Sequence, residues 1–184
     1  DGNLITYDAS GDPAAVATGT AGHHLESTGA GSPPVFAGVN TPAFTVYKGS
    51  GEQAIANATW TKVELTHEYW DTDSAFDSST NYRFTVPAGK AGGYLFTYGA
   101  RGESLDAGEN IQMRMLMNEG AVYQSYVNGY AAADNQEVWV RGSVMLNLTA
   151  GDYLSLYVYQ NEGAQRNIHN IYVHWGGFRI GKGA

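Results

Sequence analysis

The sequence predicts an all-β protein, and three observations support this prediction. Glycine accounts for 24 of the 184 residues, about twice its average share of roughly 7%, which favours a chain rich in turns. Tyrosine occurs 13 times, and strands prefer Tyr, Val and Thr. From about Thr41 onward, short runs alternate apolar and polar residues between Gly, Asn and Asp, while helical patterning is almost absent.

Residues 1–40 differ from the rest because small residues dominate them. Turn signals at residues 11–13 and around Gly29 separate short apolar stretches. This segment cannot build a core alone, so we expect brief strands or extended strips that need a partner surface, or in part a flexible linker. Five of its apolar residues are candidates for attachment to a particle: Leu4, Ile5, Tyr7, Leu25 and Phe36.

Residues 41–184 form the predicted head domain, which begins with strand-length runs that have one apolar side. Tyr82, Phe84 and Val86 alternate with polar residues just before a Pro-Ala-Gly turn. In a later run, Leu154, Leu156 and Val158 share one face and tyrosines share the other, so we expect the aliphatic face to point inward. The predicted strands are residues 43–47, 60–68, 82–86, 93–100, 111–117, 122–127, 138–148, 153–160 and 172–180. Nine strands in about 140 residues fit a β-sandwich or jelly roll.

Composition excludes several classes of protein. The 18 acidic and 10 basic residues give a net charge of -8 with scattered basic residues, which disfavours nucleic-acid binding. The absence of Cys excludes disulfides, thiolate metal sites and a Cys nucleophile. No membrane span or signal peptide is visible, so we expect no membrane insertion. The start at Asp1 without Met leads us to expect a processed product or a fragment.

Metal and catalytic motifs are weak. His23 and His24 are adjacent in a Gly-rich segment, and His169 and His174 do not have the spacing of a helical zinc pair. Three carboxylates resemble the opening of a calcium loop, but the sixth position is not Gly and the twelfth is not Glu; they are Asp71, Asp73 and Asp77. No nucleophile elbow, phosphate loop or cofactor fingerprint is present. We therefore expect no metal site, no cofactor and no catalysis.

Two aromatic and amide-rich segments, 126–136 and 161–167, are predicted loops and the best functional candidates. They combine flat apolar rings with hydrogen-bond donors and acceptors, a mixture that contacts sugars or protein epitopes. The alternative is that the tyrosines line a subunit interface or cap the sandwich. The candidate receptor-binding residues are Tyr126, Asn128, Tyr130, Asn135, Gln165 and Arg166.

Five segments in order resemble the C1q and tumour-necrosis-factor-like jelly roll. They are residues 76–89, 93–98, 115–120, 142–152 and 175–180, which together place the resemblance over about residues 43–184. Gly176 departs from the family pattern, where Ser often stands. The resemblance implies a non-enzymatic homotrimer with both ends of each head domain at one end of the assembly.

Residues 1–40 are similar to segments of bacteriophage tail-fibre and virion proteins. Together the two resemblances imply a structural protein of the virion surface: a head fibre, a tail-fibre tip or a capsid decoration. Residues 1–40 would join other virion proteins, and the head would bind a host-surface glycan or protein. Two alternatives remain, a secreted C1q-like recognition module and a glycan depolymerase.

Overall fold

The computed structural model describes residues 3–38 and 41–182 and confirms the all-β fold class. The chain divides into two compact units, Asp1–Asn40 (unit 1) and Thr41–Ala184 (unit 2). Among the described residues, the one helix is a three-residue 3-10 turn, η1 (Asn170–Tyr172). None of the helical structure described is long and apolar enough to cross a membrane.

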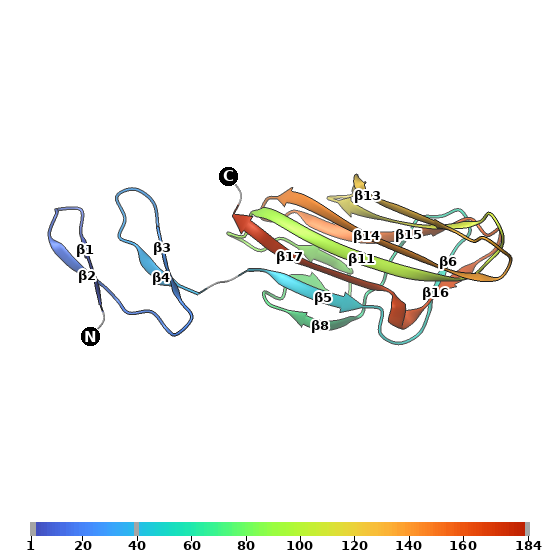
Figure 1. Cartoon of the computed structure of the whole chain (residues 1–184), viewed down its shortest axis with the longest axis horizontal. Helices are drawn as coiled ribbons and strands as arrows, with labels where there is room; N and C mark the ends of the chain where they lie inside the picture. Colours follow the sequence, from blue (N-terminus) through green and yellow to red (C-terminus); the bar gives the residue numbers. More distant parts are fainter. Residues whose placement is uncertain (1–2, 39–40, 183–184) are drawn as a thin grey trace. The chain divides into compact units, whose positions relative to one another are not determined.

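Unit 1 consists of two short antiparallel hairpins (Figure 1). The first pairs β1 (Leu4–Tyr7) with β2 (Pro13–Val16), and the second pairs β3 (His24–Glu26) with β4 (Val35–Ala37). The Asp8 carboxylate closes the first turn, because its Oδ1 accepts hydrogen bonds of 2.9 Å from the backbone N–H groups of Ser10 and Asp12. Such Asx turns explain why Asp is common at this position.

Unit 2 is a sandwich of two sheets, whose front strands are visible in Figure 1. The β12 sheet has the order β13-β12-β15-β10-β9, with β7 also on β15, and the β11 sheet has the order β6-β16-β11-β17-β5-β8, with β14 also on β11. The bounds are β5 Ala43–Tyr47, β6 Gln53–Ile55, β7 Thr61–Lys62, β8 His67–Asp71, β9 Phe76–Asp77, β10 Arg83–Thr85, β11 Gly92–Leu105, β12 Asn110–Met117, β13 Gly120–Tyr130, β14 Gln136–Leu148, β15 Tyr153–Gln160, β16 Arg166–Ile168 and β17 His174–Lys182. Ala43 pairs with Phe178, so the first and last strands of unit 2 begin and end at the same end of the sandwich.

The core lies between the two sheets and is rich in aromatic rings. Phe44 stacks on Phe84 with a centroid distance of 4.8 Å and meets Trp175 edge-on at 5.2 Å. The aliphatic face of β15 points inward as predicted, since Leu154, Leu156 and Val158 are fully buried. Burying large aromatic side chains supplies much of the hydrophobic stabilisation of a sandwich.

The prediction of one strand over residues 60–68 is wrong, because the chain changes sheets there. Strand β7 pairs with β15 in the β12 sheet, and β8 pairs with β5 in the β11 sheet. Between them the side chain of Gln53 replaces a strand partner: its Nε2 donates to Lys62 O at 2.7 Å, and its Oε1 accepts from Glu64 N at 2.9 Å. An amide side chain provides both a donor and an acceptor, so it satisfies the backbone of the crossing.

Other boundaries also differ from the prediction. Residues 172–180 were expected as one strand, but Tyr172 ends the η1 turn and β17 starts at His174. The short strands β6, β9 and β16 were not predicted, since two or three residues carry too little alternation to be recognised. Strand β13 extends to Tyr130, which is three residues beyond its predicted end.

Candidate binding site

A group of aromatic side chains surrounds one arginine on the outer face of the β12 sheet. We call it the aromatic-arginine cluster; its members are Trp60, Arg114, Tyr123, Tyr126 and Tyr159. The guanidinium carbon of Arg114 lies 4.0 Å from the ring centre of Trp60, and Arg114 Nη1 donates a hydrogen bond to Tyr126 Oη. The Trp60 ring lies 5.8 Å from that of Tyr126 and 5.4 Å from that of Tyr159.

Strand alternation explains why these side chains meet. In β12, Met113 and Met115 point into the core, so Arg114 between them faces outward. Trp60 immediately precedes β7, which the β15 pairing holds beside the same face. Cation-π contacts of Arg114 with Trp60 and Tyr126 stabilise the arrangement.

The candidate receptor residues Tyr126, Asn128 and Tyr130 all lie in β13. Tyr126 falls within the predicted strand 122–127, whereas Asn128 and Tyr130 were expected in a loop, so the loop prediction is wrong for these two. The register places Asn128 opposite Gln112 and Tyr130 opposite Asn110, so β13 continues to pair with β12 up to its end. Residues two positions apart in a strand point to the same face of the sheet. Tyr126, Asn128 and Tyr130 therefore form one exposed row beside the aromatic-arginine cluster.

Of the other three candidate residues, two lie in connections between strands and one begins a strand. Asn135 occupies the β13–β14 turn with a φ of 58°, and its N–H donates to Asp106 Oδ1 at 3.1 Å. Gln165 is exposed next to Arg166, the first residue of β16. The Arg166 guanidinium is used in hydrogen bonds within the protein, because it donates to Glu162 Oε1 at 2.6 Å and to Ser104 O at 2.8 Å.

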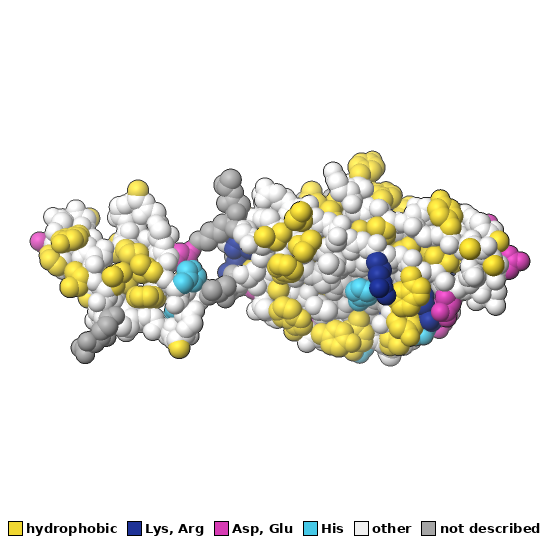
Figure 2. Space-filling view, in the orientation of Figure 1, with side chains coloured by type: hydrophobic (Ala, Val, Ile, Leu, Met, Phe, Trp, Pro, Cys, Tyr) yellow, Lys and Arg dark blue, Asp and Glu magenta, His cyan; other side chains and the backbone are white. Residues whose placement is uncertain are grey.

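The β11 sheet carries a second exposed surface, which is mainly apolar. We call it the apolar face; it consists of Trp70, Leu95, Met145, Phe178 and Ile180. Figure 2 shows hydrophobic side chains over this side of unit 2, with a hollow between them. The register places Met145 and Phe178 on either side of Leu95, and the hollow has Gly176 and Thr97 in its lining. Met145 is 72% exposed and Phe178 46% exposed, which is unusual for grouped large apolar side chains.

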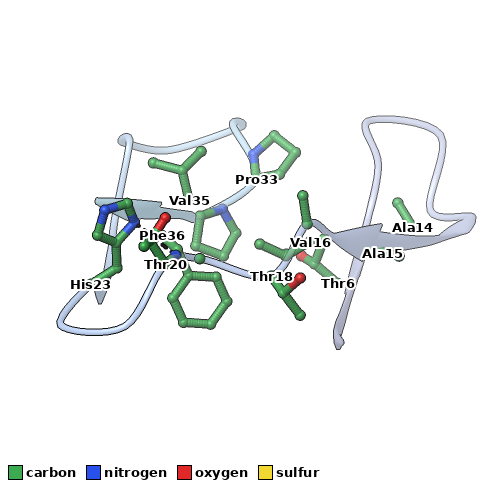
Figure 3. A pocket seen from close by; sticks show the side chains of 13 residues that line it. Thr6, Ala14, Ala15, Val16, Thr18, Thr20, His23, Pro33, Val35 and Phe36 are labelled. Carbon is green, nitrogen blue, oxygen red and sulfur yellow. Dashed lines mark hydrogen bonds between the residues drawn. The ribbon is translucent and has the colours of Figure 1, made fainter. Parts of the chain in front are cut away.

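The attachment residues predicted in unit 1 have two different environments. Leu4, Ile5, Tyr7 and Leu25 are exposed. Phe36 instead is partly buried in a pocket of about 400 Å³ that Val16 also lines. Figure 3 shows the pocket side chains lying between the two hairpins.

The aspartates considered for calcium act as turn acceptors. Asp71 Oδ2 accepts from Phe76 N at 2.7 Å, and Asp71 Oδ1 accepts from Asp73 N at 3.2 Å. The Asp77 carboxylate accepts from the backbone of residues 79–81 and from the Asn81 side chain. Hydrogen bonds from the N–H groups of Thr80 and Ser79 and from the Asn81 side chain hold the pKa of Asp77 well below its ordinary value.

His169 and His174 have different surroundings in the structure. His174 is half-buried on β17, where burial and the nearby Arg141 charge lower its pKa. His169 instead approaches Glu52 and Glu103, two residues that the sequence analysis did not select. No local motif could have revealed them, because the three residues come from distant parts of the chain.

Comparison with known proteins identifies the fold. No family model and no curated protein sequence matches this chain. Among solved structures, the globular domain of the zebrafish complement 1qA protein is 17% identical and matches with a TM-score of 0.53, covering 77% of this chain and 98% of that one. Eiger TNF from S. frugiperda is 13% identical with a TM-score of 0.58, covering 78% and 94%. Murine APRIL at pH 5.0 is 8% identical with a TM-score of 0.56, covering 77% and 100%. Unit 2 thus has the jelly-roll fold of C1q and TNF domains.

Proposed function

We propose that the chain is a non-catalytic binding protein that assembles as a homotrimer and is displayed on a virion surface. The observation that carries this proposal is the apolar face of the β11 sheet. A soluble protein rarely leaves grouped large apolar side chains in water unless another surface covers them. Copies of the same chain would bury this face in a closed symmetric assembly.

The ends of unit 2 fit such an assembly. Ala43 and Phe178 are paired neighbours, so the chain enters and leaves the sandwich at one end. Three copies packed side by side through the apolar face would have all three entry points at the same end. Asn135, Gln165 and Arg166 would then be repeated three times around the axis.

The aromatic-arginine cluster is the proposed receptor contact. It lies on the β12 sheet, whereas the apolar face lies on the β11 sheet, so trimer assembly would leave the cluster open. Tyr123 is 79% exposed and Tyr126 37% exposed. Flat rings beside the amides of Gln112 and Asn128 suit a glycan or a protein epitope on a host cell. Three copies would turn weak single contacts into avid binding.

Attachment to the particle is assigned to unit 1. Its hairpins expose Ile5 at 70% and Tyr7 at 67%, which are apolar side chains available to another virion protein. The resemblance of residues 1–40 to virion and tail-fibre segments supports this assignment. The jelly-roll head would fit a secreted recognition module equally well. The proposed place on a virion therefore depends on unit 1.

The oligomeric state tests the proposal directly. Light scattering of the purified full chain should give three times the 19.7 kDa chain mass. Phe178→Asp should shift the protein to monomers, because it places a charge at the centre of the apolar face. Tyr123→Asp is the matched control and should remain a trimer. A monomeric wild-type protein would refute the trimer.

Co-sedimentation with phage particles tests the attachment. An Ile5→Asp, Tyr7→Asp double variant should lose particle binding while remaining a trimer. A Tyr69→Asp variant, which changes an exposed tyrosine of β8, should still sediment with the particles. Unchanged sedimentation of the double variant would remove unit 1 from the attachment.

A further inference from the structure

Three side chains with metal-binding atoms converge on the outer face of the β11 sheet. Glu52 precedes β6, Glu103 lies in β11 and His169 follows β16. One donor atom of each lies within 4.8 Å of the others. We propose that these residues, called the His169 site, bind a divalent transition metal ion such as zinc. This goes beyond the proposed function and does not depend on it.

The strand register brings the three residues together. Ile168 pairs with Gln53 on one side and with Gly102 on the other. His169 is therefore opposite Glu52, and the N–H of His169 donates to Arg101 O at 3.1 Å. Because Arg101 and Glu103 share a strand face, the Glu103 carboxylate also reaches the imidazole. Strands β6 and β16 lie at the end of unit 2 opposite the start of β5 (Figure 1).

The distances fit an ion better than a direct contact. His169 Nε2 lies 3.9 Å from Glu103 Oε1, which is too far for a hydrogen bond. A tetrahedral zinc with ligands near 2.0–2.1 Å holds neighbouring ligand atoms on the order of 3.3 Å apart. The three donors, which lie within 4.8 Å of one another, therefore need to close by up to about 1.5 Å around zinc. Glu52 is exposed and can make that movement.

Neighbouring groups orient the ligands. Asn167 Nδ2 donates to Glu52 Oε2 at 2.7 Å, and Arg101 Nη2 donates to Glu103 Oε1 at 2.7 Å. Each contact occupies one oxygen and directs the carboxylate, as partners of metal ligands commonly do. His169 Nδ1 is buried and has no hydrogen-bond partner, which leaves Nε2, the nitrogen nearest to Glu103, as the metal-binding atom of the ring.

The local charge favours a cation despite the arginine. Arg101 also pairs with Glu137 Oε2 at 2.9 Å. The carboxylates of Glu52, Glu103 and Glu137 against one guanidinium leave two negative charges, which a divalent ion would neutralise. The imidazole selects zinc and similar transition metals over calcium and magnesium, which prefer oxygen ligands. Three protein ligands leave a fourth position for water.

A bound ion would fasten the edge of the β11 sheet. Strands β6 and β16 have three residues each, and β16 reaches β11 through a single residue pair. An ion shared by Glu52, Glu103 and His169 would tie all three strands together. Metal binding that requires the folded arrangement raises the stability of the folded state.

Calorimetric titration of the full chain with ZnCl2, after removal of metal with EDTA, tests the proposal. We expect one zinc per chain and a rise in the midpoint of thermal unfolding on zinc addition. Glu52→Gln and His169→Gln should each weaken zinc binding at least tenfold. The matched controls are Glu68→Gln on β8 and His24→Gln in unit 1, and both should bind zinc as the wild type does.

Two results would overturn the proposal. The first is absence of zinc binding to the wild type in the titration. The second is binding that Glu52→Gln leaves unchanged or that His24→Gln abolishes. Circular dichroism checks that each variant folds. Glu52→Gln keeps a side-chain oxygen that can accept the hydrogen bond from Asn167, so we expect it to fold. Its zinc affinity therefore tests the site even if His169→Gln fails to fold.

Discussion

Gly177 lies directly against the ring of Phe96 across the β11–β17 ladder. A Cβ at Gly177 would stand 2.4 Å from Phe96 Cδ1, well inside van der Waals contact. The ring cannot easily retreat, because Phe44 and Trp175 lie on its other sides with centroid distances of 6.3 Å and 6.1 Å. The Gly-Phe end of the last strand is thus a packing requirement of the aromatic core.

We predict that Gly177→Ala lowers the free energy of unfolding by about 1–3 kcal/mol, the usual cost of overpacking a core. Gly93→Ala is the control in the adjacent strand, since a Cβ there meets nothing within 4 Å. Urea unfolding of both variants measures the difference. Equal stability of the two variants would show that the Phe96 ring moves without cost.

Tyr98 joins the two sheets, because its Oη donates to the backbone oxygen of Ser125 inside the sandwich. Tyr98→Phe would remove this buried hydrogen bond between the sheets, so we expect a loss of about 1–3 kcal/mol in the free energy of unfolding. Tyr130→Phe, which removes an exposed hydroxyl, should leave the stability unchanged. A Tyr98→Phe protein as stable as the wild type would contradict this prediction.

The same residue predicts an alkaline transition. Burial raises the pKa of Tyr98 from 10.0 to about 12. Between these values the folded state keeps a proton that the unfolded state releases, so stability falls as the pH rises from 10 to 12. The decrease should be smaller in Tyr98→Phe, as measured by urea unfolding at several pH values. The same slope in both proteins would assign the loss to other groups.

Asp77 predicts an effect in acid. Its turn hydrogen bonds lower its pKa from an ordinary value of 3.8, so its stabilising contribution is present above that pH and is lost as the pH falls. Asp77→Asn should therefore be less stable than the wild type at pH 7, and the difference should shrink below pH 3.8. Thermal unfolding across this range measures it. A difference that does not change with pH would mean that the carboxylate charge is unimportant.

The receptor contact also makes a prediction. Trp60→Ala removes the central ring of the aromatic-arginine cluster and frees Arg114, so binding to immobilised host-surface glycan or protein should weaken about tenfold, as expected for one aromatic contact. Tyr69→Ala changes an exposed tyrosine on the other sheet and should bind normally. Light scattering must show that both variants keep the wild-type mass. Normal binding by Trp60→Ala would move the receptor contact away from the cluster.

Several features could be predicted from the sequence because they depend on neighbours along the chain. The alternation of Leu154, Leu156 and Val158 identified both the strand and its buried face, since residues two apart share a face. Turn residues likewise marked most strand ends. The extension of β13 to Tyr130 was missed because polar and aromatic residues occur in exposed strands as well as in loops.

The tertiary structure alone decided which distant residues meet. Residues 60–68 alternate like one strand, but Gln53 lets the chain cross between sheets, a contact that no local pattern records. Trp60 and Arg114 come together for the same reason, through the pairing of β7 and β12 with β15. Glu52, Glu103 and His169 form one set of metal-binding atoms only because β16 pairs with β6 on one side and with β11 on the other. The sequence by itself determined the all-β class and many of the strand faces, which arise from short-range periodicity, whereas sheet pairing determined the sites.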